Sequence, residues 1–110
     1  MKRIAVPVAL ITTVLSGCGE PSEESKAAMQ EIRMQRMARE FVSSGLKDPE
    51  NAQFRNQRGM CGEVNSKNSF GAFTGFQGFI AGSKELVVLQ RDSRLKPEEF
   101  SQLWSKFCSG

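Results

Sequence analysis

The first seventeen residues have the layout of a secretion signal, and they limit what the rest of the chain can fold into. Lys2 and Arg3 precede an apolar run over residues 4–15, which ends in small residues before Cys18. A helix that spans a bilayer needs roughly 20 apolar residues, and this run has about a dozen. A short buried N-terminal helix is the alternative. We expect residues 1–17 to be a cleaved signal, which leaves one small exported domain of about 93 residues.

The signal ends in Leu15-Ser16-Gly17-Cys18, which resembles the lipobox of bacterial lipoproteins. The resemblance implies that the Cys18 thiol receives a diacylglycerol, that cleavage occurs before it, and that the new amino group is acylated, typically with palmitate. Two or three acyl chains anchor a protein stably to a membrane. Gly19 resembles the residue found there in lipoproteins sent to the outer membrane. We expect a protein anchored in the cell envelope, at the outer membrane facing the periplasm, with residues 18–25 as a polar tether.

Cys61 and Cys108 are the other two of the three cysteines in the chain. Once Cys18 is lipidated they form an even pair, and export places them in a compartment that permits disulfides. Reactive or metal-binding thiols are the alternative, but the chain has no histidine and no CxxC pair. We therefore expect a structural Cys61–Cys108 disulfide.

Charge and composition argue against several classes of function. Removal of residues 1–17, which carry two basic and no acidic residues, lowers the formal net charge from +3 to +1, and nucleic-acid binding requires a basic face. Without histidine, a catalytic triad, a Cys-His pair and a typical zinc site are excluded. The adjacent carboxylates Glu23/Glu24 and Glu98/Glu99 point in different directions along a helix or tether. We expect no enzyme, cofactor, metal or nucleic-acid partner.

The residues from 26 to 110 predict a single α+β domain. A long helix is expected over residues 24–45 with Ser22 as N-cap, and a second helix over residues 97–108. Strands are expected at about residues 54–65, 73–81 and 85–90. Short connections favour a three-stranded antiparallel meander packed against both helices in two layers. The core-facing stripes of the two helices are Met34, Met37, Ala38, Phe41 and Val42, and then Phe100, Leu103, Trp104, Phe107 and Cys108.

Phe70, Phe73, Phe76 and Phe79 recur every three residues, a spacing that matches neither the strand nor the helix. In a strand, Phe70 and Phe76 would face one way and Phe73 and Phe79 the other. One interpretation places them in the core of a small domain. The other makes this strand an exposed groove for a peptide, a glycan strand or a partner protein. The candidate contact residues are then Phe73, Phe76, Gln77 and Phe79, with Asn65, Lys67 and Asn68 of the neighbouring turn.

The turn itself has two interpretations. Asn65 and Asn68 suit a hairpin turn for backbone reasons alone. Exposed loops also carry function, so Asn65, Lys67 and Asn68 stay candidates for binding.

The stretches LKDPENAQFR (46–55), CGEVNSKN (61–68) and FGAFTGF (70–76) resemble a group of small exported lipoproteins from proteobacteria and their prophages. The resemblance implies an envelope location and a prophage origin. It brings no enzymatic activity and no site residues to this chain.

Three arginines, Arg33, Arg36 and Arg39, recur on the long helix away from its apolar stripe. Because the tether would hold this helix near lipid, they are candidate contacts for phosphate headgroups. A solvated face with Glu31 and Glu40 nearby is the alternative.

The sequence as a whole favours a non-catalytic, lipid-anchored envelope protein that binds a protein partner. A prophage-type exclusion factor, or an immunity or inhibitor factor, would be a specific form of it. The alternative is a structural or assembly accessory of an outer-membrane complex that makes its contact through the long helix.

Overall fold

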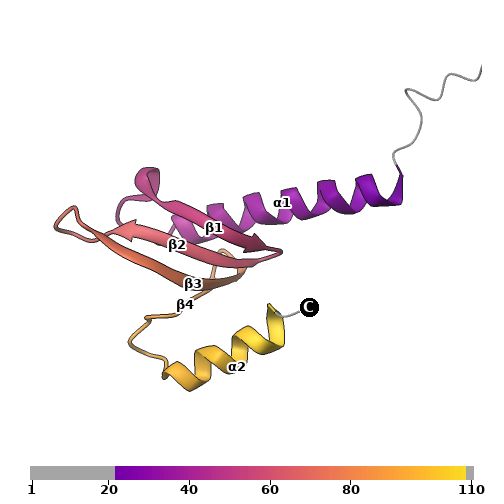
Figure 1. Cartoon of the computed structure of the whole chain (residues 1–110). Coiled ribbons are helices and arrows are strands. Elements are labelled where there is room, and N and C mark those ends of the chain that lie inside the picture. Colours follow the sequence, from indigo (N-terminus) through magenta and orange to yellow (C-terminus); the bar gives the residue numbers. More distant parts are fainter. Residues whose placement is uncertain (1–21, 109–110) are drawn as a thin grey trace, which may run out of the picture.

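The computed structural model describes residues 22–108, in which helices cover both faces of an antiparallel sheet (Figure 1). The strands follow chain order, β1-β2-β3-β4, and each is antiparallel to its neighbour. The predicted α+β class is confirmed, and the sheet has four strands where three were expected. The elements are α1 (Glu23–Ser43), the 3₁₀ turn η2 (Pro49–Asn51), β1 (Gln53–Arg58), β2 (Cys61–Lys67), β3 (Phe73–Ser83), β4 (Leu86–Leu89) and α2 (Pro97–Phe107).

The extra strand arises because the single strand expected over residues 54–65 is a hairpin. Asn56 and Gly59 have φ angles of 52° and 57°. Glycine adopts such left-handed values freely and asparagine tolerates them. The pairing skips from Arg55↔Glu63 to Arg58↔Cys61, so β1 bulges just before the chain reverses. The backbone N–H of Gly59 then donates to the Glu31 carboxylate of α1 at 2.7 Å, which fixes the turn on the helix.

Helix α1 begins where local signals place it. The Ser22 hydroxyl accepts a hydrogen bond from the Ser25 N–H at 3.1 Å, and Glu23 and Glu24 lie in the first turn. The helix therefore starts inside the tether predicted for residues 18–25. The predicted signal and Cys18 lie outside the described residues. Within residues 22–108, no helix combines the length and the apolar character needed to cross a membrane.

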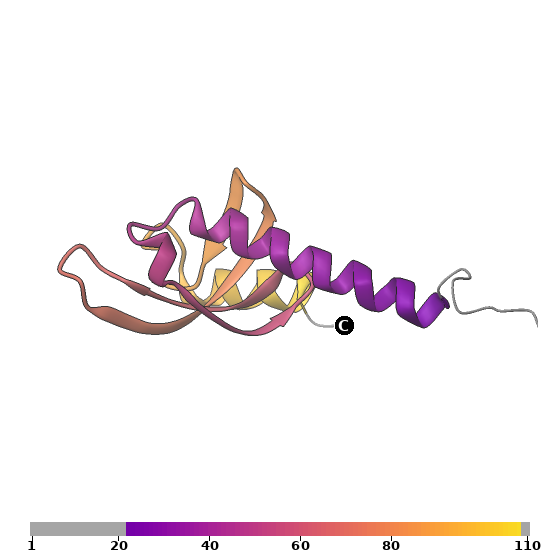
Figure 2. The ribbon, with the colours of Figure 1, turned by 90° about the horizontal axis from the view of Figure 1, so that it is seen from above.

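The larger core lies between α1 and the sheet. Phe79 of β3 lies at the centre of this core and is 0% exposed. The Phe54 ring of β1 contacts the Phe79 ring edge-on, with the ring centroids 5.8 Å apart. Helix α1 extends beyond the sheet, so the sheet does not cover its N-terminal part (Figure 2). Met37, expected on the core-facing stripe, is 41% exposed while the adjacent Ala38 is 0% exposed, so Met37 lies at the margin of the buried stripe. The buried residues of this core are Ala38, Val42, Val64, Phe79 and Ala81.

Helix α2 covers the opposite face of the sheet, so the domain has three layers where two were predicted (Figure 1). Its core is smaller and contains Cys61, Ile80 and Phe100 as buried residues. Pro97 occupies the first turn of α2, and the Lys96 N–H donates to the Glu99 carboxylate at 3.1 Å. Phe107, expected on the core-facing stripe, is 61% exposed.

Candidate functional site at the tip of the β2–β3 hairpin

The four phenylalanines of the Phe-Gly stretch differ sharply in exposure. Phe70 is 93% exposed and Phe73 is 44% exposed, whereas Phe76 is half-buried and Phe79 is 0% exposed. Phe70 precedes β3, so the alternation expected along one continuous strand does not apply to it. Phe79 is corrected from a candidate contact residue to a core residue, because sheet and helix side chains enclose it. The exposed aromatic surface comes from Phe70 and Phe73.

These two residues belong to what we call the hairpin tip, residues 67–73, which joins β2 to β3. Asn68 organises its backbone: its side-chain oxygen accepts from the N–H groups of Phe70 at 2.9 Å and Ala72 at 3.2 Å. The Asn68 backbone also donates to Ala72 at 2.9 Å and accepts from the Gly71 N–H at 3.0 Å. Asn68 therefore shapes the loop that presents Phe70, a structural role that accounts for an asparagine here.

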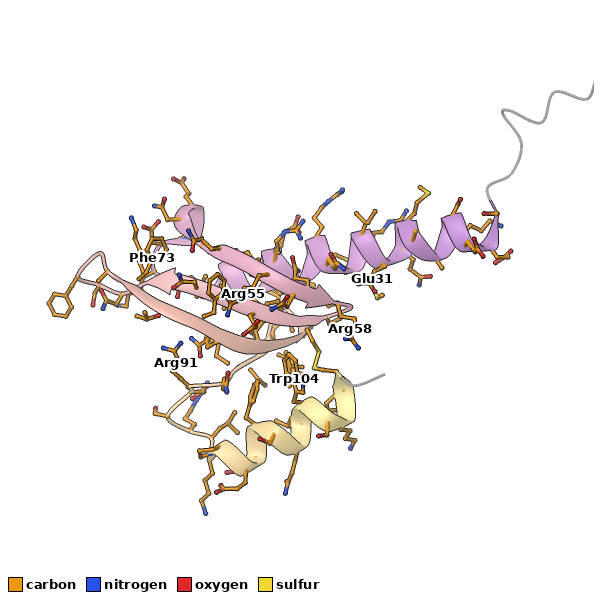
Figure 3. All side chains as sticks on the ribbon, viewed as in Figure 1. Glu31, Arg55, Arg58, Phe73, Arg91 and Trp104 are labelled. Carbon is orange, nitrogen blue, oxygen red and sulfur yellow. A yellow bond between two sulfur atoms is a disulfide. The ribbon has the colours of Figure 1, made fainter. Side chains whose placement is uncertain are left out.

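Lys67 places a positive charge beside the exposed aromatics. Its ammonium nitrogen lies 5.3 Å from the centroid of the Phe73 ring, within cation–π range. Figure 3 shows Phe73 at the end of the sheet away from the N-terminal half of α1. The tip thus carries two exposed phenylalanines and one lysine at a projecting end of the domain.

Behind the tip, Asn65 supports an irregular point in β3. Gly75 has a φ of 91°, and its N–H donates to the Asn65 side-chain oxygen at 2.9 Å. The amide nitrogen of Asn65 donates in turn to the Gln53 side chain at 3.1 Å. Both polar atoms of Asn65 are therefore engaged within the domain, so this predicted contact residue stabilises the hairpin.

Gln77 is likewise engaged, with Arg91 as its partner. The Gln77 side-chain oxygen accepts from the Arg91 N–H at 2.9 Å. The Arg91 guanidinium donates to three successive carbonyls of β3, those of Thr74, Gly75 and Phe76, at 2.9, 3.0 and 3.0 Å. Arg91 thus stabilises the N-terminal part of β3, which has no pairing partner in β4.

Phe76 is covered on one face by an arginine. The Arg55 guanidinium carbon lies 3.7 Å from the Phe76 ring centroid, and Arg55 Nε lies 3.2 Å from the Glu63 carboxylate. The Asn56 side chain donates to the same carboxylate oxygen at 2.5 Å. Hydrogen bonds from Asn56 and then from Arg55 lower the pKa of Glu63. Phe76 therefore packs against a charged cluster of Arg55 and Glu63. This cluster lies on the same face of the sheet as α2, beyond the part that the helix covers.

The three arginines of α1 divide into two groups. Arg33 and Arg36 are exposed and line a shallow hollow of about 180 Å³ with Met29 and Ile32. Arg39 is half-buried, and its guanidinium donates to the Gln57 side chain at 2.7 Å. Of the three predicted headgroup contacts, Arg39 therefore serves to hold α1 on β1.

The predicted cysteine pair is brought together across the second core. The sulfur atoms of Cys61 and Cys108 lie 1.99 Å apart, the distance of a disulfide bond, with their Cα atoms 5.8 Å apart. The bond joins the start of β2 to the end of α2.

The remaining acidic groups with shifted pKa values accept hydrogen bonds within the domain. The Gly59 N–H and then the Gln35 side chain lower the pKa of Glu31. Hydrogen bonds from Arg94 lower the pKa of Asp92 to about 2. Across residues 22–108 there is no cluster of three or more His, Cys, Asp or Glu side chains able to hold a metal ion.

Two surface features were missed from the sequence. Phe70 belongs to the phenylalanine series, but the sequence pattern does not mark it as a contact residue. Its neighbours Ser69 and Gly71 are turn-forming residues, and this signal could have placed it in an exposed loop. The second feature is an apolar pocket of about 400 Å³ between α2 and the edge of the sheet. No local pattern indicates it, because its lining comes from four separate segments.

Comparison of the chain with protein-family models, with curated proteins and with solved structures finds no match.

Proposed function

We propose that this protein is a non-catalytic, lipid-anchored protein of the bacterial cell envelope that binds a protein partner through its hairpin tip. The observation that carries the proposal is the exposure of Phe70, 93%, on a loop whose backbone is fixed by Asn68. Exposed apolar patches on small domains mark contact sites, and aromatic residues supply much of the binding energy of protein interfaces.

The internal hydrogen bonds of the tip support this use. Asn68 fixes the loop, Asn65 fixes Gly75, and Arg91 fixes the β3 backbone next to it. A loop that is already ordered loses less conformational freedom when it binds. The tip is therefore suited to present Phe70 and Phe73 as rigid anchors.

The position of the tip also agrees with anchoring through the N-terminus. The tip and the N-terminal end of α1 lie at opposite ends of the domain in both views (Figures 1 and 2). If lipid at Cys18 holds the N-terminal end near a membrane, the tip faces away from it. A partner would then be met in the periplasm, as an exclusion factor or an inhibitor of a toxin or hydrolase requires.

The test removes the two exposed rings together. Phe70→Ser with Phe73→Ser is expected to leave the thermal unfolding midpoint unchanged and to abolish the crosslinked complex recovered from intact cells. The matched control is Met29→Ser with Ile32→Ser, which removes two exposed apolar side chains from α1. An unchanged crosslinked complex in the Phe70/Phe73 variant would contradict the proposal.

A second candidate function rests on α1. Its exposed Met29 and Ile32 line a hollow together with Arg33 and Arg36, and the N-terminal part of the helix extends beyond the sheet (Figure 2). Such a face suits an accessory that packs against an outer-membrane complex. Loss of the crosslinked complex in the Met29/Ile32 variant, with the Phe70/Phe73 variant unaffected, would select this function instead.

Anchoring is tested separately through Cys18. Cys18→Ala is expected to remove palmitate labelling and to release the protein from the membrane fraction. Continued incorporation of labelled palmitate in this variant would contradict lipidation at Cys18, whatever the outcome at the tip.

A further inference from the structure

The pocket between α2 and the sheet is chemically unlike the rest of the surface. Its volume is about 400 Å³, within the range of small-molecule sites. Cys61, Ile80 and Val88 lie opposite one another on β2, β3 and β4 and form its floor. Leu103 and Phe107 of α2 form one wall, and Leu86 forms the edge at the β3–β4 turn.

Two side chains at the mouth of the pocket leave much of their apolar surface in water. Leu86 is 64% exposed and Phe107 is 61% exposed. Exposure of both along one opening costs hydrophobic free energy that an apolar occupant would recover. The lining is almost wholly apolar, so the inserted part of an occupant must be hydrocarbon without hydrogen-bonding groups.

Two cations, Arg58 and Lys106, lie close to lining residues at the disulfide end of this pocket, although neither lines it. Arg58 is the pairing partner of Cys61, and Figure 3 shows it at the end of the sheet where the disulfide joins α2. The Lys106 ammonium lies 5.4 Å from the Phe107 ring centroid. Glu31, the acidic group that interacts with Arg58, is already held by Gly59 and Gln35. At the other end, Lys84 and Glu85 offset each other in charge.

We propose that this pocket binds the acyl chain of a fatty acid, with the hydrocarbon against Ile80 and Val88 and the carboxylate near Arg58 and Lys106. An apolar pocket with no internal polar group and a cationic edge is complementary to an anionic, single-chain amphiphile. This site is independent of the hairpin tip and goes beyond the proposed partner-binding function.

Gly82 provides a way to close the pocket without removing a core contact. It lines the pocket, its φ is not in the left-handed region, and a Cβ there would lie 3.3 Å from the flexible end of Leu86. Gly82→Leu is therefore expected to fold and to fill the space. Gly45→Leu is the matched control, because a Cβ at Gly45 would meet only the Val42 carbonyl at 3.8 Å.

The experiment uses isolated membranes that contain the full chain and a dodecanoate probe with a diazirine near its methyl end. After irradiation, mass spectrometry is expected to find the probe on peptides that contain Leu86 or Phe107. Gly82→Leu should reduce this labelling about tenfold, an effect of about 1.4 kcal/mol, while Gly45→Leu should not. Unlabelled fatty acids should compete about fourfold better for each added methylene until the pocket is full.

A second comparison tests whether the pocket requires an anionic head group. A probe with the same chain and a trimethylammonium head should label the pocket about tenfold less, and Arg58→Gln with Lys106→Gln should remove that difference. Equal labelling of Gly82→Leu and Gly45→Leu would overturn the proposal, as would equal labelling by the two probes. Closure of the pocket by a second copy would also overturn it, and would appear as dimer crosslinks that Gly82→Leu abolishes.

Should Gly82→Leu fail to fold, Leu86→Ser at the exposed edge takes its place, and the same reduction in probe labelling is expected.

Discussion

Removal of the Cys61–Cys108 bond is expected to release α2 from the sheet while the other core stays folded. Phe100, 6% exposed, is the only buried residue of α2. The helix has 11 residues, and isolated helices shorter than about 12–15 residues are marginal in water. Burial of Phe100 contributes about 1.5–3 kcal/mol, Leu103 and Trp104 are only partly buried, and the disulfide adds a covalent restraint on this layer.

The size of the effect follows from the loop that the bond closes. The two cysteines are 47 residues apart, but β2, β3 and β4 stay folded when α2 opens, so the bond restrains only the flexible stretch over residues 90–108. The chain-entropy model gives about 3 kcal/mol for a loop of that length. Since each 1.36 kcal/mol is a factor of ten, loss of the bond should increase the opening equilibrium of α2 by roughly 100-fold. The α1 core, centred on Phe79, does not depend on this bond for its contacts.

Hydrogen exchange measures this directly. In Cys61→Ser, Cys108→Ser and the double variant, amides of α2 should lose nearly all protection, whereas those of Val64 and Phe79 should keep most of theirs. The three variants should agree, because each breaks the same bond. Reductant should reproduce the effect in the unmodified chain and change nothing in the double variant. Protected α2 amides without the bond, or additive losses, would refute this reasoning.

Three further predictions concern stability. Phe79→Ala should lower the free energy of unfolding by about 3–5 kcal/mol and Phe70→Ala by less than about 0.5 kcal/mol, as measured by urea denaturation. Gly62→Ala should cost about 1–3 kcal/mol in the same assay, because its Cβ would lie 2.9 Å from the Phe79 ring. The folded-state pKa of Glu31 lies below its ordinary value of 4.5, so its contribution is present above that pH and is lost as the pH falls through the folded pKa. Urea denaturation between pH 3 and 6 should show that the free energy of unfolding falls less steeply with decreasing pH in Glu31→Gln than in the unsubstituted chain.

The helices could be predicted because their signals are local. Ser22 caps α1 through a residue three positions away, and Pro97 begins α2 at the expected position. The extent of burial could not be predicted in the same way. Met37 and Phe107 belong to the predicted stripes but are exposed, because Met37 lies at the margin of the buried stripe beside Ala38 and Phe107 is the last residue of α2. Periodicity gives the face of a helix and says nothing about how wide or how long the covered part of that face is.

The hairpin of β1 and β2 shows a different limit. A lone glycine in a polar strand is consistent with a bulge, a turn or neither, so Gly59 did not divide the predicted strand. The turn is specified by Glu31, which lies 28 residues earlier in the chain and accepts the Gly59 N–H. The exposure of the phenylalanines could not be predicted from their spacing for a similar reason. Position along the strand decides that Phe79 is covered and Phe73 is not.

The two faces of the sheet are stabilised by different means, and the pocket follows from that difference. The α1 face is closed by Val64, Phe79 and Ala81 packing against the helix. The α2 face offers the apolar row of Cys61, Ile80 and Val88, and beyond it the charged Arg55 and Glu63. A covalent bond holds α2 here without requiring close packing along its whole length. The helix can therefore stay in place over an unfilled apolar space, which a domain held by burial alone would have had to close.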